Sequence, residues 1–211
     1  MRSDPKNNLI ALPRLATPAV SDAELVQAVA EGDQAALRTV WDRYLPAVHR
    51  TLHALLGNDQ AIDDLAQEVF LSFYHSAGRI LDRGSLRPYL LGAAAKLAIF
   101  EIRTRTRRNY WHRLFHRSSA SGLGAVGPEV EGRDALRSLR AVLEKIPERE
   151  RQAFVLRHVH DLSPAEVAEA MGLPQGTTKR AISEGRRRVL LRAQKEPALA
   201  EYLRTGEEGQ P

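Results

Sequence analysis

Aromatic and basic side chains share one side of a predicted helix in residues 88–108. Counted at about 3.6 residues per turn, this side carries Tyr89, Lys96, Phe100, Arg103 and Arg107. Aromatic rings stack on unpaired bases while arginine and lysine hold the phosphates, so the combination is suited to single-stranded nucleic acid. Spacing alone leaves a second interpretation equally open, in which Tyr89 and Phe100 pack on a neighbouring helix and the cations are only solvated.

A second cationic surface is predicted on the helix of about residues 175–193. Its outward side carries Lys179, Arg180, Ser183, Glu184 and Arg187, and Thr177 and Arg188 flank that side. Arginine pairs bidentately with guanine, while lysine and threonine hold phosphates, so the surface is suited to the major groove of duplex DNA. The alternative is an amphipathic helix in a bundle, whose polar side is only solvated.

An acidic side is predicted on the helix of about residues 60–75. It carries Asp63, Asp64, Gln67 and Glu68, with Leu71 in their midst and away from the apolar stripe of the same helix. An exposed leucine ringed by carboxylates is suited to docking on a basic protein surface. A solvated helix side with one stray leucine is the commoner explanation of such spacing.

Catalytic and metal-binding patterns are missing from the sequence. His49 and His53 have the spacing of two ligands on one helical side, but no further ligand cluster accompanies them. No glycine-rich phosphate loop, nucleophile motif or acid pair of catalytic spacing occurs, and the absence of cysteine excludes disulfides and thiolate chemistry. We therefore expect no metal, no cofactor, no small-molecule substrate and no catalysis by this chain.

The elements that position these side chains are helices. A capping box at Ser21 to Glu24 starts the first one, Asp33 is suited to cap the second, and strand signals are scarce throughout. A second capping box at Ser163 to Glu166, followed by Gly172, predicts a helix-turn-helix whose last helix is the cationic one. In that helix Thr178 and Ile182 should face inward and Gly185 should allow a close approach.

The predicted fold is all-α, with two small helical domains joined by a flexible linker and the helix-turn-helix in the second. The expected segments are a flexible leader (1–20), the first domain (21–110), the linker (111–133), the second domain (134–195) and a flexible tail (196–211). The chain has 211 residues, a net charge of +5 and no apolar run long enough to span a membrane. The prolines at positions 5, 13 and 18 argue against a secretory signal, so we expect a cytoplasmic protein that is not membrane-inserted.

The order of two blocks of motifs resembles one family. The first block has Asp-Ala-Glu-Leu-Val at 22–26, Glu-Gly-Asp at 31–33, Asp-Asp-Leu-Ala-Gln-Glu-Val-Phe at 63–70 and Leu-Ala-Ile at 97–99. The second has Ile-Pro-Glu-Arg-Glu-Arg at 146–151 with Phe154, Leu156 and Arg157, Glu-Val-Ala-Glu at 166–169 and Gly-Thr-Thr-Lys-Arg at 176–180. They resemble regions 2 and 4 of the extracytoplasmic-function (ECF) subfamily of the sigma-70 family of bacterial RNA polymerase sigma factors.

The resemblance implies a role for each surface. The acidic side of residues 63–71 would bind core RNA polymerase, the side from Tyr89 to Arg107 would open DNA and capture the minus-10 strand, and the last helix would read the minus-35 element. An anti-sigma factor is a further expected partner, and the linker would run toward the RNA exit path. The alternative function is a stand-alone helix-turn-helix regulator of duplex DNA, which has no need of the acidic side.

Four positions depart from the family pattern. Tyr89 stands where tryptophan is usual, Lys96 where asparagine is usual and Phe100 where aspartate is usual. Because the last two lie on the proposed strand-capture side, they are expected to alter minus-10 specificity. Glu184 replaces a frequent arginine or histidine, and its carboxylate would accept from a cytosine amino group or pair with Arg180 or Arg188.

Overall fold

The structure, a computed structural model, describes residues 20–80, 85–115 and 131–194. The described residues form helices and turns, with no strand among them, which confirms the all-α prediction. Leader residues 1–19, tail residues 196–211 and the middle of the predicted linker lie outside these ranges. In the three described ranges, no helix is both long and apolar enough to cross a lipid bilayer.

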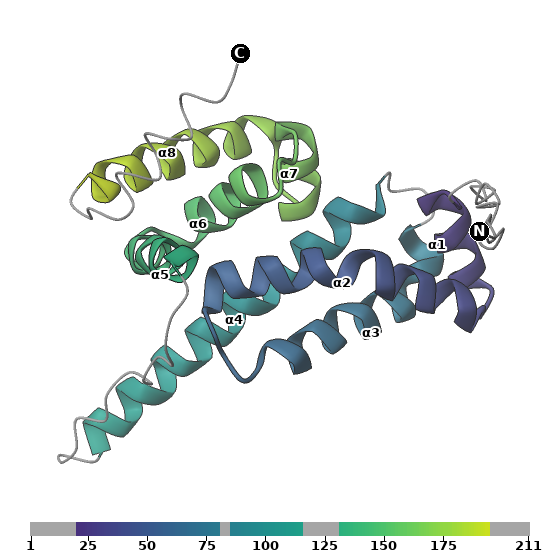
Figure 1. Cartoon of the computed structure of the whole chain (residues 1–211), viewed down its shortest axis with the longest axis horizontal. Helices are drawn as coiled ribbons and strands as arrows, with labels where there is room; N and C mark the ends of the chain where they lie inside the picture. Colours follow the sequence, from purple (N-terminus) through teal and green to yellow (C-terminus); the bar gives the residue numbers. More distant parts are fainter. Residues whose placement is uncertain (1–19, 81–84, 116–130, 195–211) are drawn as a thin grey trace, which may run out of the picture.

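The first half of the chain (residues 20–80 and 85–115) is a four-helix arrangement (Figure 1). Its helices are α1 (Asp22–Ala30), α2 (Gln34–Leu56), α3 (Ile62–Ile80) and α4 (Leu86–Phe115). The predicted starts are confirmed, because Ser21 and Glu24 form a reciprocal capping box and the Asp33 carboxylate accepts from two backbone N–H groups of α2. Large apolar side chains such as Leu52, Phe73 and Leu90 are fully buried where these helices meet.

The second half (residues 131–194) contains the predicted helix-turn-helix. Its elements are α5 (Glu131–Glu144), α6 (Glu148–Phe154) with a π-helical turn at Val155–Val159, α7 (Pro164–Met171) and α8 (Gln175–Ala193). Gly172 has a φ of 65°, the left-handed conformation that lets α7 end in a sharp turn. A Cβ at Gly185 would lie 2.7 Å from the backbone oxygen of Glu150, so the glycine allows α8 to approach α6 as predicted.

Helices α3 and α4 run further than the spacing predicted. α3 continues to Ile80 rather than ending near 75, and α4 continues to Phe115 rather than ending near 108, so it enters the segment expected as a linker. Residues 109–115 contain neither glycine nor proline, so nothing in them stops a helix.

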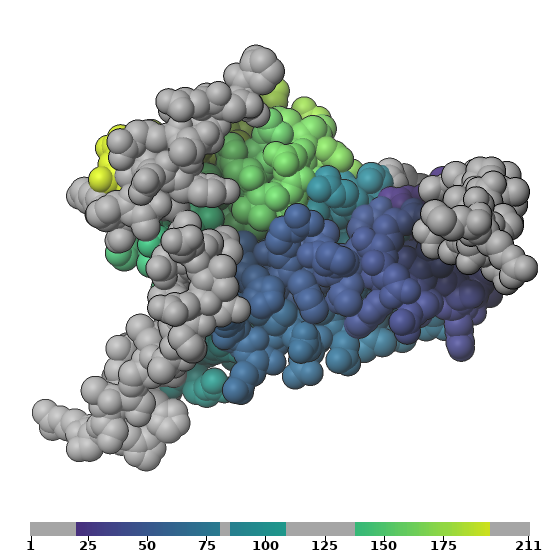
Figure 2. All heavy atoms as spheres, viewed as in Figure 1, coloured from purple at the N-terminus to yellow at the C-terminus, as the bar shows by residue number. Residues whose placement is uncertain are grey.

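The two halves pack directly against each other, which the sequence did not predict. Leu91 of α4 belongs to the same buried cluster as Leu156, Leu162 and Val167 of the second half. Figure 2 shows the green surface of the second half resting on the blue and teal surface of α2 and α4. In the described residues the two domains are therefore one docked body rather than two separated modules.

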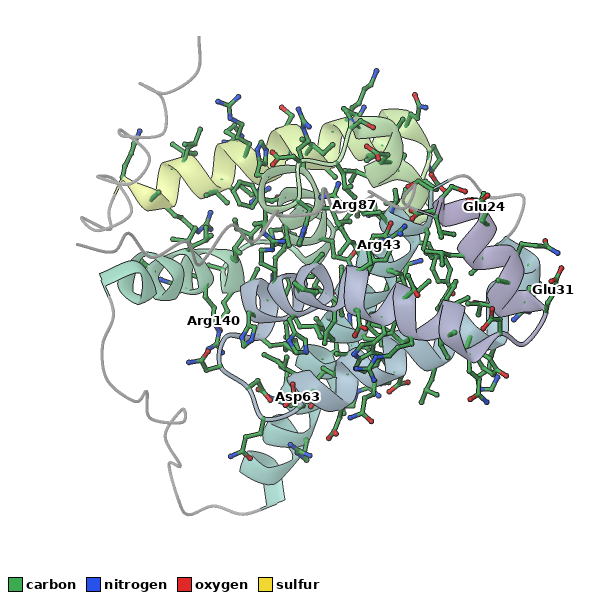
Figure 3. The ribbon with its side chains drawn as sticks, turned by 45° about the vertical axis from the view of Figure 1, so that its right-hand side comes forward. Glu24, Glu31, Arg43, Asp63, Arg87 and Arg140 are labelled. Carbon is green, nitrogen blue, oxygen red and sulfur yellow. The ribbon has the colours of Figure 1, made fainter. Side chains whose placement is uncertain are left out.

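Polar contacts also join the halves. The Nε2 atom of His160 lies 2.8 Å from Oγ1 of Thr51 in α2, and both side chains are buried. Arg87 of α4 donates from Nη2 to the backbone oxygen of His160 at 2.7 Å, and Figure 3 shows Arg87 between α4 and the second half. Burial, with Arg50 and Arg87 nearby, lowers the pKa of His160 from 6.5 to about 4.

The docked chain should lose stability in mild acid. Because packing keeps His160 neutral, its contribution is complete above pH 6.5 and is lost as the pH falls toward 4. We expect the free energy of unfolding in urea to fall by about 2 kcal/mol more between pH 7 and pH 5 in the wild type than in His160→Gln, which cannot titrate. An equal pH dependence of the two proteins would contradict this role of His160.

Candidate nucleic-acid and protein interfaces

The predicted acidic side is exposed on α3. Its members Asp63, Asp64, Gln67, Glu68 and Leu71 all face solvent, and the Leu71 side chain is 58% exposed. Figure 3 shows Asp63 on the side of the first half that points away from α7 and α8. We call these five residues the α3 face.

Tyr74 extends the α3 face and was missed by the sequence analysis. It lies one turn after Leu71 and is 41% exposed, although it is large and partly apolar. The i, i+3 spacing of the two residues was the available signal. The α3 face therefore combines carboxylates with two adjoining apolar groups, which suits a partner surface that is both basic and apolar.

The predicted strand-capture side of α4 is exposed from Lys96 onward. Lys96, Phe100, Arg103 and Arg107 are solvent-exposed, and Phe100 is 67% exposed, with no helix of the described ranges packed over its ring. Of the two interpretations left open for Phe100, the structure supports the exposed one. We call these four residues the α4 face.

Tyr89 is not counted in the α4 face, because of the two interpretations left open for it the structure supports packing on a neighbouring helix. Its ring is partly buried against Phe73 of α3, with centroids 6.4 Å apart, and its hydroxyl lies 2.7 Å from the hydroxyl of Ser76. Tyr89 and Lys96 lie on the same side of α4, but α3 packs over the first turn of α4, where Tyr89 lies. The packing interpretation therefore holds at Tyr89 and fails at Phe100.

Two arginines of α4 already hold carboxylates. Arg103 makes a bidentate contact with Glu148 of α6, with Nε 2.7 and 2.8 Å from its two oxygens. This guanidinium holds the pKa of Glu148 below its usual range. Arg105 pairs with Asp59 and with Glu101, so it fixes α4 to the turn after α2.

The predicted DNA-reading side of α8 is divided into two stripes. Thr177, Arg180 and Glu184 line a cavity of about 540 Å³ between α8, the start of α6 and Arg103 of α4. Lys179, Ser183 and Arg187 line a second cavity of about 580 Å³ on the other side of the helix. Thr178 is buried and Ile182 is partly buried, so the inward side is as predicted.

The second cavity adds two arginines and a histidine that the sequence analysis did not assign to DNA binding. Arg157, His158 and Arg186 line it together with Lys179 and Arg187. Arg186 follows Lys179 by seven residues and so shares its helical side, a signal that the sequence offered. Burial and the two neighbouring arginines lower the pKa of His158. This edge of α8 is therefore the more strongly cationic one and is suited to phosphates.

Glu184 pairs most closely with a different arginine from those expected. Its carboxylate accepts from Nη2 of Arg187 at 2.7 Å, and this contact lowers its pKa. Arg188 lies 2.6 Å from Glu150 of α6 and only 4.0 Å from Glu184, and it is half-buried. Arg188 therefore joins α8 to α6 and also pairs loosely with Glu184, as one of the expected alternatives had it, while the stronger partner of Glu184 is Arg187, which the sequence analysis did not name.

The histidine pair on α2 has local contacts. Nδ1 of His53 lies 3.0 Å from the backbone oxygen of Gly57, and Nε2 of His49 lies 3.5 Å from the Asp63 carboxylate. In the part of the chain that the structure describes, no group of three or more potential ligands gathers around a point.

Comparisons with known proteins match both halves of the chain. The family model described as sigma-70 region 2 matches residues 40–108, and the model described as sigma-70, region 4 matches residues 136–189. The chain is 32% identical over 166 residues to ECF RNA polymerase sigma factor SigD of Mycobacterium tuberculosis, covering 75% of this chain and 76% of that protein. It is 26% identical over 172 residues to ECF RNA polymerase sigma factor SigW of Bacillus subtilis, covering 76% and 90%.

Solved structures share the fold. The structure of CnrH in complex with the cytosolic domain of CnrY aligns with a TM-score of 0.62 at 19% identity, covering 83% of this chain and 98% of that one. The sigma factor RpoE of Bartonella quintana, solved with the anti-sigma factor NepR, aligns with a TM-score of 0.57 at 18% identity, covering 75% and 97%.

Proposed function

The chain belongs to the ECF subfamily of the sigma-70 family of RNA polymerase sigma factors, and from this premise we propose a task for each of its exposed faces. The α3 face binds core polymerase, the α4 face captures the minus-10 strand, and α8 reads the minus-35 element. The observation that carries the proposal is the presence of both sigma regions, in order, with an acidic surface on one and basic surfaces on both. A stand-alone regulator of duplex DNA leaves the matched region 2 without a task.

A protein with these faces supplies promoter specificity to a separate enzyme, RNA polymerase. Its relatives are named as RNA polymerase sigma factors. We propose that this chain catalyses no reaction itself and works in the cytoplasm, where polymerase and promoter DNA are found. Its bound partners are then core polymerase and promoter DNA.

The α3 face supports polymerase binding through charge and shape together. Asp64 and Glu68 are exposed and one turn apart, beside the exposed Leu71. Long-range attraction between such carboxylates and a basic partner speeds encounter, and the apolar centre adds affinity once water is excluded.

The α4 face supports strand capture through stacking and charge. Phe100 offers an open ring for an unpaired base, and Lys96 and Arg107 lie one and two turns away for its phosphates. Because a positive and an aromatic side chain replace the usual asparagine and aspartate, we propose that the chain prefers a minus-10 sequence different from that of typical relatives.

Helix α8 supports duplex recognition through its N-terminal half. Recognition helices contact base edges mainly with their first turns, where Thr177, Lys179 and Arg180 lie. Arg186 and Arg187 further along the helix are placed for the flanking phosphates. Because Glu184 is neutralised by Arg187, we assign it a role in fixing that arginine.

An anti-sigma factor is a proposed partner. The solved neighbour from Bartonella quintana was captured with its anti-sigma factor. A protein that covers the α3 face would keep this chain from polymerase.

Transcription in vitro tests the proposal directly. Purified chain and core polymerase should together transcribe a subset of a library of random promoter sequences. The enriched templates should share one sequence motif at the minus-35 position and another at the minus-10 position. Core polymerase alone is the control. If no template depends on the added chain, the proposed function is wrong.

Removing the Phe100 ring should weaken strand capture without unfolding the protein. Stacking of one base on an aromatic ring contributes about 1–3 kcal/mol, so Phe100→Ala should lower binding of a single-stranded minus-10 oligonucleotide to the polymerase complex at least about fivefold. Its unfolding free energy should hardly change, because the ring is largely exposed.

Tyr89→Phe should give the reverse of Phe100→Ala: lower stability and unchanged oligonucleotide binding. Losing the hydroxyl contact with Ser76 should cost about 1 kcal/mol of stability, while oligonucleotide binding stays unchanged. Binding that depends on Tyr89 and not on Phe100 would contradict the assignment of the α4 face.

A further inference from the structure

We propose that the C-terminal tail, residues 196–211, binds in the second cavity of helix α8 and competes there with DNA phosphates. The inference rests on the proposed function, because α8 is the helix assigned to the minus-35 element. It goes beyond that function by naming a second occupant for the same surface. This occupant is an acidic and partly apolar segment of the same chain.

The cavity of about 580 Å³ beside α8 has a cationic rim. Among the described residues that line it, none is a carboxylate. Its ionisable lining residues are Arg157, His158, Lys179, Arg186 and Arg187. Arg187 pairs with Glu184, but Lys179 and Arg186 are exposed and have no carboxylate partner in the described ranges. The positive charge of the rim is therefore available to attract an anionic ligand.

The same cavity has an apolar part that a phosphate backbone does not require. Pro164, Ile182 and Leu190 line it, and all three are half-buried. Leu191, the next residue of α8, is 49% exposed. Water is released when such side chains are covered by other apolar groups, which phosphates do not offer. The cavity therefore suits an occupant that carries both carboxylates and apolar side chains.

The sequence of the tail has this combination. It contains four glutamates and one arginine, so its net charge is −3 in a chain whose net charge is +5. The glutamates are Glu196, Glu201, Glu207 and Glu208. Leu199, Tyr202 and Leu203 lie among them, and their i, i+3, i+4 spacing would place all three on one side of a helix. The tail therefore matches the cavity in charge and in apolar content.

The tail starts close enough to the cavity to reach all of it. Helix α8 ends at Ala193, and Leu190 of the cavity lies one turn before that end. Lys179, at the far end of the cavity, is fifteen residues before Gln194, or about 22 Å along a helix. Since an extended chain spans about 3.3 Å per residue, the glutamates from Glu201 onward can lie anywhere along this distance. A short tether also keeps the local concentration of the tail in the millimolar range, so weak binding is sufficient.

Binding of the tail and binding of DNA exclude each other at this surface. Arg186 and Arg187 are the cations assigned to phosphates that flank the minus-35 element, and Lys179 lies in the first turns of α8. A carboxylate held by these groups takes the place of a phosphate. Non-specific duplex DNA, which offers phosphates alone, is therefore disfavoured, whereas a specific site adds base contacts and displaces the tail.

Neutralising two tail carboxylates tests the contribution of charge. Glu201→Gln with Glu207→Gln removes two negative charges from the tail. Glu31→Gln with Asp42→Asn removes the same number from exposed positions outside α8 and is the matched control. Because both double variants change the net charge equally, a difference between them reports the tail contact rather than the overall charge of the chain.

A second tail variant tests the apolar contribution without changing any charge. Leu199→Ser with Leu203→Ser removes two leucines that would cover the apolar part of the cavity. Val20→Ser, at a position that is 47% exposed and directly before the cap of α1, is the control for loss of an apolar side chain outside α8. All these positions lie in the tail or on the surface, so the fold is kept.

The measurements use the full-length chain. Affinity for a random-sequence DNA duplex at low salt reports access to α8. Because the sequence contains no cysteine, Gln210→Cys gives one selective site for a nitroxide label. In nuclear magnetic resonance spectra the label broadens the amide signals of residues near the tail, so it reports where the tail binds.

We expect the nitroxide to broaden the signals of Lys179, Ser183 and Arg186, and added duplex to remove this broadening. Both tail variants should lose it and should bind the duplex about fivefold more tightly, the gain when a free form populated at about 20% becomes dominant. The two control variants should match the wild type. If the label broadens no signal of α8, or if the tail variants gain no affinity, the tail is not the occupant of the cavity.

Mixing nitroxide-labelled chains with separate isotope-labelled chains distinguishes the tail of the same chain from that of a second copy. Broadening in the mixture that equals the broadening within one chain would overturn the intramolecular contact. None of these readouts uses polymerase or a promoter. A chain whose tail behaves as expected but that supports no transcription would therefore remove the proposed function and leave the tail contact standing.

Discussion

Reversal of two charges on the α3 face, Asp64→Lys with Glu68→Lys, is expected to weaken binding of the chain to core polymerase at least about thirtyfold, or 2 kcal/mol. Both carboxylates are exposed and make no intramolecular ion pair with a described residue. The change therefore affects the partner surface rather than the fold. Lysine at both positions removes the attraction of the carboxylates for a basic partner surface and adds repulsion from it. The expected effect is therefore large.

Binding and transcription assays test this double variant, and a second double variant with the same change of charge is its control. Affinity for fluorescently labelled core polymerase should fall, transcription should fall with it, and binding of the chain to duplex DNA should be kept or rise. The variant Glu31→Lys with Asp42→Lys reverses the same number of exposed charges, one directly after α1 and one on α2, and should bind polymerase like the wild type. Equal loss in both double variants would show that net charge, and not the α3 face, governs the complex.

Neutralisation of α8 by Arg180→Gln with Arg187→Gln should have the reverse effect. We expect duplex binding to weaken about a hundredfold, since each arginine contributes about 1–3 kcal/mol through phosphate or base contacts. The loss has a second source, because Arg187 neutralises Glu184, and the freed carboxylate would face the DNA backbone. Polymerase binding through α3 should be unchanged.

Salt dependence separates this effect from misfolding. The slope of log affinity against log salt should become shallower by about 2, one for each arginine that no longer neutralises a phosphate. Arg38→Gln with Lys145→Gln removes two exposed cations outside α8 and should leave the slope as it is in the wild type. An unchanged slope in the α8 variant would place the phosphate-binding cations elsewhere on the chain.

Helix ends and turns of this fold were predictable because they depend on residues close in sequence. Ser21 and Ser163 each cap a helix with a glutamate three residues later, and Gly172 makes the left-handed turn of the helix-turn-helix. Each requirement is met within a few residues, so spacing is sufficient evidence. The helical sides that carry the α3 face and Phe100 were predictable for a similar reason, because the period of a helix separates its sides, but the exposure of Phe100 was not.

Contacts between distant segments were not predictable from spacing. Tyr89 has the helical position of an exposed residue, but α3 covers it, and Arg103 meets a glutamate 45 residues later in the chain. Arg188 lies 2.6 Å from Glu150 of α6 but 4.0 Å from Glu184 of its own helix. Periodicity identifies the side of a helix on which a residue lies, and only the packing of the other helices decides whether that side faces water.

The shared core has a consequence for how long the protein survives in a cell. Leu91 has its buried neighbours in the second half, so an opened chain that lacks a partner presents this leucine and the backbone around Gly92 to water. Proteases and chaperones act on such surfaces, and a loss of about 1–2 kcal/mol of stability changes abundance several-fold. Molecules whose two halves separate would therefore be the first to be degraded.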